Sequence, residues 1–211
     1  MATPPAGNIR ITATDHVIET VLWPKLAQAL PKYPQISVEV VIDYGLTDIV
    51  ADHFDFGIRL GDGLANGIEA VRIAPDMRFV MVGAPSYMES RAMPTRPQDL
   101  MEHECINMRL PTRGGLYAWE LEKKTARKSI RESKAGSYSM ASIRFLDAAV
   151  SGFGLAYVPE DIAHPHLVDG TLVPVMEAWW RTFPGLHLYY SSEREKSRAM
   201  QVLIDELRYP G

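Results

Sequence analysis

The chain has 211 residues, a net charge of −4 and 23 % charged residues, which suits one large domain or two small lobes with a buried core. Surfaces that bind the nucleic-acid backbone are normally basic, so this balance argues against nucleic-acid binding through this chain alone. The single cysteine, Cys105, excludes an intramolecular disulfide and a multi-cysteine metal site and fits a reducing cytoplasm. No apolar run approaches the roughly 20 residues of a membrane helix, and the N-terminus has no apolar signal-peptide region.

The first part of the chain predicts two strands with a helix between them. Residues 9–14 and 36–42 alternate apolar side chains with period two, as strands do. Residues 16–30 place apolar side chains four apart on one helical stripe. Pro24 lies inside this stripe and lacks a backbone N–H, so we expect a kink or a helix that begins near it.

The stretch Asp43–Gly61 predicts the end of a strand, a sharp turn, a short helix and a second strand. Thr47 and Asp48 are suited to cap that helix, because one offers a side-chain oxygen and the other a negative charge. In sheets built from such crossovers, ligands lie outside the carboxyl ends of the strands. The sequence therefore predicts a ligand-binding edge at Tyr44-Gly45 and at Arg59 to Gly61.

The rest of the chain continues to alternate between strands and helices, which predicts an α/β fold. We expect strands over 79–84, 105–109, 154–158 and 186–191, helical turns over 85–91 and 97–100, helices over 142–151 and 194–208, and a hairpin of 117–121 with 129–134, bridged by the basic stretch 123–128.

Short motifs recur along the chain in a characteristic order and spacing. They are Gly7-x-Ile9-Arg10-Ile11, Leu22-x-Pro24-x-Leu26, Tyr33-Pro34, Asp48-Ile49-Val50-Ala51, Phe54-Asp55-x-Gly57-Ile58-Arg59-x-Gly61, Leu100-x-x-His103-x-Cys105-Ile106, Gly114-Gly115-Leu116-Tyr117-Ala118-Trp119-Glu120, Ala148-Ala149-x-Ser151-Gly152-x-Gly154-Leu155-Ala156-Tyr157-Val158-Pro159 and Gly170-x-Leu172-Val173. Each motif is weak alone, but together they are specific. The chain resembles the effector-binding domain of LysR-type transcriptional regulators over nearly its whole length.

The resemblance implies a type 2 periplasmic-binding-protein fold, in which two Rossmann-like lobes are joined by two crossover segments. By analogy, the first lobe comprises 7–78 plus 193–209 and the second comprises 79–192. Residues 1–6 are expected to be a linker remnant, because no winged helix-turn-helix is found before Gly7. DNA binding is therefore expected only through that missing N-terminal domain.

The resemblance also implies a small-molecule effector in the cleft between the lobes, a carboxylate- or aromatic-bearing metabolite, and assembly as a homodimer or homotetramer. We expect no cofactor, no metal, no enzymatic activity and no contact with a membrane. Two alternatives stay open. A stand-alone solute-binding protein of the same fold would need an export signal, and a hydrolase would need Cys105 as an activated nucleophile.

In the first lobe, the candidate ligand-binding residues are those at the ends of the strands: Thr14, Asp15, His16, Tyr44, Gly45, Arg59 and Leu60. Backbone N–H groups at a strand-to-helix turn favour a carboxylate, and Arg59 could pair with one through two hydrogen bonds. The alternatives are that Thr14 and Asp15 only cap the helix, that His16 is exposed, and that Arg59 is solvated or salt-bridged.

In the second lobe, the resemblance places seven residues around the cleft: Met108, Arg109, Met140, Ala141, Ser142, Tyr157 and Pro159. Helix capping also explains Ser142, and simple packing also explains Met140 and Tyr157.

Four other patterns do not support a site. The glycines of 61–67 lack dinucleotide-loop spacing, and His164-Pro165-His166 lacks companion metal ligands. His103 and Cys105 lack an orienting acid, and the resemblance implies a structural role for them. The basic residues of 123–134 alternate with glutamates, which indicates a solvated hairpin face.

Overall fold

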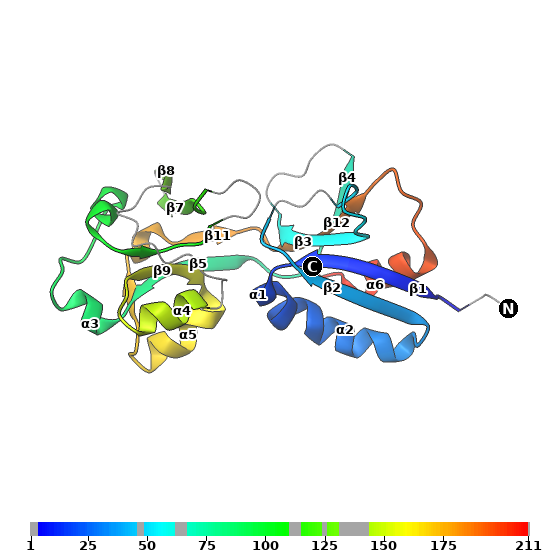
Figure 1. Cartoon of the computed structure of the whole chain (residues 1–211), viewed down its shortest axis with the longest axis horizontal. Helices are drawn as coiled ribbons and strands as arrows, with labels where there is room; N and C mark the ends of the chain where they lie inside the picture. Colours follow the sequence, from blue (N-terminus) through cyan, green and yellow to red (C-terminus); the bar gives the residue numbers. More distant parts are fainter. Residues whose placement is uncertain are drawn as a thin grey trace. The chain divides into compact units, whose positions relative to one another are not determined.

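The computed structural model describes residues 4–45, 49–61, 67–109, 115–123, 126–130 and 144–210, with the side chains of 126–130 excepted. The chain divides into two compact units, residues 1–76 with 183–211 and residues 77–182. Each unit contains its own sheet (Figure 1).

The sheet of the first unit has the strand order β2-β1-β3-β12-β4. Its strands are β1 (Gly7–Ala13), β2 (Ile36–Ile42), β3 (Phe56–Leu60), β4 (Ile68–Arg72) and β12 (Leu186–Ser191). β1 pairs in parallel with β2 and β3, whereas β12 runs antiparallel between β3 and β4. The strand over Leu186–Ser191, which we expected in the second lobe, therefore pairs within the first unit.

The predicted first helix is a series of segments: α1 (Asp15–Val17), the π-helical η1 (Ile18–Leu22), α2 (Trp23–Ala29) and the 3₁₀ turn η2 (Leu30–Lys32). Pro24 lies in the first turn of α2, so the prediction that a helix begins near it is confirmed. A proline is tolerated there because the N–H groups of the first turn have no partner within the helix. The π-helical segment η1 accommodates the change in helix geometry between α1 and α2, directly before this proline.

The last helix, α6 (Arg198–Leu207), packs against α2 and β1 with one apolar face. Met200, Leu203, Ile204 and Leu207 are buried on that face, as their spacing predicted. The helix begins later than expected because Ser197 caps it, its side chain accepting a hydrogen bond from the Met200 N–H over 3.2 Å.

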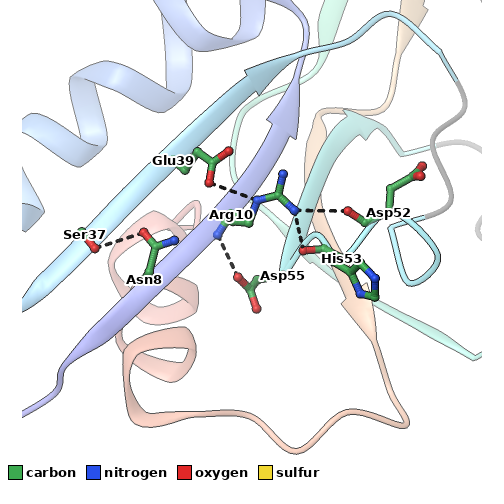
Figure 2. A network of polar contacts seen from close by, with 7 residues as sticks. All are labelled: Asn8, Arg10, Ser37, Glu39, Asp52, His53 and Asp55. Atoms are coloured by element: carbon green, nitrogen blue, oxygen red, sulfur yellow. Dashed lines mark hydrogen bonds and ion pairs between the residues drawn. The ribbon is translucent and has the colours of Figure 1, made fainter.

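The short helix predicted after Gly45 is wrong for the residues that the structure describes, since 49–53 form turns. His53 has a φ of 57°, a left-handed conformation that ends any helix. Arg10 fixes this turn, because its guanidinium donates to the carbonyls of Asp52 and His53 (Figure 2). The expected caps Thr47 and Asp48 lie outside the described residues.

Arg10, a residue of β1, is also the centre of a polar network (Figure 2). Its Nε donates to Glu39 over 3.1 Å, and its backbone N–H donates to Asp55 Oδ2 over 2.8 Å. Asp55 is buried and also pairs with Arg194 over 2.6 Å. A buried carboxylate needs such partners, so Asp55 is a structural residue at the entry to β3.

The sheet of the second unit has the strand order β10-β5-β9-β6, with β11 paired to β5. Its strands are β5 (Met77–Gly83), β6 (Cys105–Ile106), β9 (Leu155–Pro159), β10 (Val173–Val175) and β11 (Arg181–Phe183). Its helices are α3 (Pro85–Met88), η3 (Pro97–Glu102), α4 (Arg144–Val150), α5 (Glu160–Val168) and η4 (Glu177–Trp179). Both α4 and α5 contact β9 and β5 (Figure 1).

The predicted hairpin is present as β7 (Trp119–Lys123) and β8 (Ala126–Ile130). Its turn is shorter than expected, since Lys123 pairs directly with Ala126. Of the basic stretch that was predicted to bridge the strands, Lys123 therefore lies within β7 and residues 126–128 lie within β8.

Candidate functional site

Arg59 joins the carboxyl ends of three strands in the first unit. Its Nη1 donates to the carbonyls of Ile58, over 2.8 Å, and Thr12, over 3.4 Å. Its Nη2 donates to the carbonyls of Asp43 and Gly45, over 3.1 Å each. These bonds connect β3 with the end of β1 and with the turn that follows β2. The turns that carry the predicted ligand-binding residues are thereby held at one edge of the sheet.

This arrangement bears on the role predicted for Arg59. A two-pronged pairing with a carboxylate would use donors that serve main-chain carbonyls here. The four carbonyls are formally neutral, so they do not themselves cancel the positive charge of Arg59. In this conformation Arg59 orders the backbone at this edge.

Asp15 acts within its own turn. Its Oδ1 accepts a hydrogen bond from the His16 N–H over 2.7 Å, while the Thr14 side chain makes no capping hydrogen bond. The His16 carbonyl accepts from Thr20 Oγ1 over 2.8 Å. Of the two readings of Asp15, these contacts favour a residue turned toward the start of the helix.

Tyr44 and Gly45 lie in a tight turn after β2, where Asp43 Oδ1 accepts from the Gly45 N–H over 2.8 Å. Leu60 is half-buried and pairs with Leu186 of β12. The structure thus brings the seven predicted residues of the first unit to the ends of β1, β2 and β3.

Tyr189 was missed by the sequence analysis, although it lies at this edge. Burial raises the pKa of its hydroxyl, nearby Asp43 adds to the rise, and nearby Arg59 opposes it. Its ring occupies the space above Gly57, where a Cβ atom would come within 2.4 Å of the hydroxyl. The available signal was the alternation of Gly57, Arg59 and Gly61 together with the tyrosine pair Tyr189-Tyr190 in a predicted strand.

In the second unit, Tyr157 is a core residue that is 6 % exposed. Its hydroxyl donates to the Glu120 carbonyl over 2.8 Å, and its ring packs against Phe79 and Trp119. Burial also raises the pKa of Tyr157 strongly. These contacts match the packing alternative, which the sequence had left open.

The other candidate ligand-binding residues of the second unit differ in their backbone contacts and in their positions. Met108 accepts a hydrogen bond from the Tyr117 N–H over 2.7 Å, and Arg109 forms an isolated bridge with Leu116. Pro159 ends β9 and directly precedes α5. Met140, Ala141 and Ser142 lie outside the described residues.

His103 and Cys105 are both buried. His103 Nδ1 lies 3.3 Å from the Tyr87 hydroxyl, and burial lowers the pKa of this histidine. Cys105 Sγ lies 4.0 Å from the Leu100 carbonyl. These contacts favour the structural role that the resemblance implied for the pair.

Across the ranges that the structure describes, no group of three or more His, Cys, Asp or Glu side chains could hold a metal ion. Within the same ranges, no helix is long and apolar enough to cross a membrane.

Comparison with known proteins shows which family the chain resembles. Residues 2–209 match the model of the LysR substrate binding domain. A Pseudomonas aeruginosa protein named "Putative transcriptional regulator" is 43 % identical over 205 residues, which cover 97 % of this chain and 67 % of that protein. The HTH-type transcriptional regulator PgrR of Escherichia coli is 37 % identical over 208 residues, which cover 98 % of this chain and 69 % of PgrR.

Solved structures agree at the level of the fold. The full-length Vibrio cholerae activator AphB superposes with a TM-score of 0.78 at 22 % identity, over 97 % of this chain and 68 % of AphB. The CrgA regulatory domain of Neisseria meningitidis gives 0.73 at 21 % identity, over 96 % of this chain and 98 % of that domain. Such regulatory domains have the type 2 periplasmic-binding-protein-like fold, so the predicted fold class is confirmed.

The regulator names also bear out the prediction that the chain is not an enzyme. The family match covers nearly the whole chain, and both relatives exceed the identity at which a shared family is secure. The chain belongs to the LysR substrate-binding domain family, the regulatory domain of LysR-type transcriptional regulators.

Proposed function

We propose that the chain senses a small-molecule effector, a carboxylate- or aromatic-bearing metabolite, that binds between its two lobes. The observation that carries this proposal is the edge organised by Arg59, whose guanidinium connects the end of β1 with the turn after β2. Ligands of α/β sheets bind outside the carboxyl ends of the strands, and family membership supports this location.

The proposed site draws on both units. The first contributes Thr14, Asp15, His16, Tyr44, Gly45 and Leu60, with Arg59 as the residue that positions their turns. The second contributes Met108, Arg109, Met140, Ala141, Ser142 and Pro159, together with Tyr157, a core residue of that unit.

The proposed mechanism is a shift in the arrangement of the lobes. A ligand can cause such a shift only by binding one arrangement more tightly than the other. In a homodimer or homotetramer, the shift would change how the DNA-binding domains of the full-length regulator are presented. This chain would then act in the cytoplasm, as part of that regulator. The alternative of a stand-alone solute-binding protein gains no support from the relatives, which carry regulator names.

A thermal-shift screen of small aromatic and carboxylic acids tests the proposal. An effector should raise the melting temperature of the wild type and of His164→Ala, a matched control at an exposed histidine of α5. It should raise that of His16→Ala less, because His16 is expected to contact the ligand. Equal stabilisation of all three proteins by every hit would reject the proposed site.

A further inference from the structure

We propose that Arg72 is a positioning residue for the shift of the lobes, because it connects one of the two segments between the lobes with the residues that follow α6. The first connecting segment comprises residues 73–76, which lead from β4 to Met77, where the second unit begins. Arg72 binds this segment on one side and Tyr209 on the other, an arrangement that we call the latch. The inference rests on the proposed function, because it concerns how freely the lobes rearrange.

The guanidinium of Arg72 reaches forward along the chain to the first connecting segment. Its Nε donates to the Ala74 carbonyl over 2.9 Å, and its Nη2 donates to Asp76 Oδ1 over 2.8 Å. The N–H donors of a guanidinium form a rigid, planar fork. Two bonds from one fork therefore fix the direction in which the segment leaves β4.

Tyr209 contacts Arg72 through its backbone and through its ring. The Tyr209 N–H donates to the Arg72 carbonyl over 2.8 Å. Arg72 Cζ lies 5.3 Å from the centroid of the Tyr209 ring, so the cation is attracted to the aromatic face. β4 is at the edge of the sheet, which lets a donor from outside the sheet reach this carbonyl.

The residues that follow α6 are themselves anchored to the first unit. Lys25 Nζ of α2 donates to the carbonyl of Leu207, the last residue of α6, over 2.7 Å. A cation is favourable at this end of a helix, where carbonyls lack partners within the helix. Tyr209 is thus presented to Arg72 from a helix that packs against α2 and β1.

The second connecting segment lies against the first. A Cβ atom on Gly185 would lie 2.0 Å from the Ala74 carbonyl oxygen and 2.7 Å from that of Pro75. One residue further on, the Leu186 carbonyl accepts from the Ile73 N–H over 2.8 Å. A restraint on the first connecting segment therefore also restrains the second.

The exposure of the latch indicates that it limits movement and does not hold the fold together. The side chains of Arg72 and Asp76 are 44 % and 58 % exposed. Exposed ion pairs and exposed cation–aromatic contacts contribute little free energy to folding. The latch can therefore open while the sheet of the first unit stays intact. The alternative is a set of surface contacts without influence on the connecting segments.

The experiment measures the distance between the two units by double electron–electron resonance, without any ligand. Spin labels are attached to Gln201→Cys on α6 and His164→Cys on α5, which replace exposed residues of different units. The native Cys105 is buried, so the introduced cysteines take the label. Dilution with unlabelled protein removes distances between copies of the chain.

Tyr209→Ala and Arg72→Ala should each broaden the distance distribution, because a freed connecting segment samples more arrangements of the units. In both variants the Ile73 amide should exchange with deuterium about fivefold faster, as expected for the loss of one weak exposed contact. Amides of β1 should keep their exchange rates.

Two variants serve as matched controls. Tyr209→Phe keeps the ring and the backbone N–H, so it should give the distribution of the wild type. Arg208→Ala removes an exposed cationic side chain from the adjacent residue and should also leave the distribution unchanged.

Three results would overturn the proposal. An unchanged distribution in Tyr209→Ala, in Arg72→Ala or in both would show that the two residues do not act together on the connecting segments. Equal broadening by Tyr209→Phe and Tyr209→Ala would exclude the ring contact as the cause. Faster exchange throughout β1 would mean that the variants destabilise the whole unit.

The outcome is separable from that of the proposed function. Broader distributions in both alanine variants, in a protein where no hit of the thermal-shift screen depends on His16, would keep the latch and reject the proposed ligand site. A hit that depends on His16, together with unchanged distributions, would do the reverse.

Discussion

Single residues in the first unit are constrained by how closely the chain packs against itself. The clearest case is Gly57, because the ring of Tyr189 occupies the place where a Cβ atom on residue 57 would lie. Gly61 is similar, because a Cβ atom there would lie 2.5 Å from the ring of His187. These two glycines lie two residues before and two residues after Arg59, so the rings of Tyr189 and His187 lie on either side of the residue that joins the strand ends.

Gly57→Ala should therefore lower the free energy of unfolding by about 1–3 kcal/mol, the usual range for overpacking. Urea denaturation measures this loss. Gly115→Ala is the control, because no atom lies within 4 Å of the position that its new Cβ would occupy. Adding Tyr189→Ala to Gly57→Ala should recover part of the stability, and strict additivity of the two changes would contradict the described contact.

At the scale of elements, side-chain hydrogen bonds decide where one helix begins and how another is attached to its unit. Ser197 sets the start of α6. In the second unit, Tyr87 of α3 donates to or accepts from His103 and also accepts a hydrogen bond from the Glu104 N–H over 2.8 Å. These contacts fasten α3 to the segment that precedes β6.

Ser197→Ala should destabilise the protein by about 1 kcal/mol, because the first turn of α6 loses its side-chain acceptor. Chemical denaturation tests this value. Gln201→Ala, at an exposed position of the same helix, is expected to change stability by less than about 0.5 kcal/mol. Equal effects of both variants would mean that the cap is not formed in solution.

His103 should make the stability of the protein sensitive to acid. Burial lowers its pKa below the ordinary value of 6.5, so the folded state holds the neutral ring more strongly than the unfolded state does. This contribution is complete above the unfolded-state pKa and is lost as the pH falls through the folded-state pKa. The wild type should therefore lose stability between pH 6.5 and more acidic values.

Denaturation curves at several pH values measure this loss. His103→Gln should flatten the dependence in that window, whereas the exposed-site variant His164→Gln should retain it. If His103→Gln shows the same pH dependence as the wild type, the buried neutral histidine is not its source.

The sequence predicted those elements whose signals are local. Alternation located β1, β2 and β12, the crossover pattern of Asp43–Gly61 located β3, and the apolar stripe located α6. The helix expected before Phe54 failed because a left-handed His53, held by Arg10, replaces it with turns. The helix α5 was not predicted because Pro165 lies inside it, and the strands β10 and β11, with three residues each, are too short for a clear period.

At the scale of the whole molecule, the family could be predicted because its motifs are spread along nearly the entire chain. The pairing of β12 with β3 and β4 could not, since it depends on contacts between residues far apart in sequence. The same holds for the candidate site. Motif positions pointed to the turns after β1 and β2, but the four carbonyls around Arg59 and the approach of Tyr189 to Gly57 emerge only from the tertiary register.

The central claim is that an effector engages both units at once. Hydrogen–deuterium exchange with and without a hit from the thermal-shift screen measures this most directly. The account predicts that saturating effector slows exchange at 13–17 and 43–45 of the first unit and also at 155–159 of the second. Slower exchange confined to a single unit, or at neither set of residues while the melting temperature still rises, would contradict it.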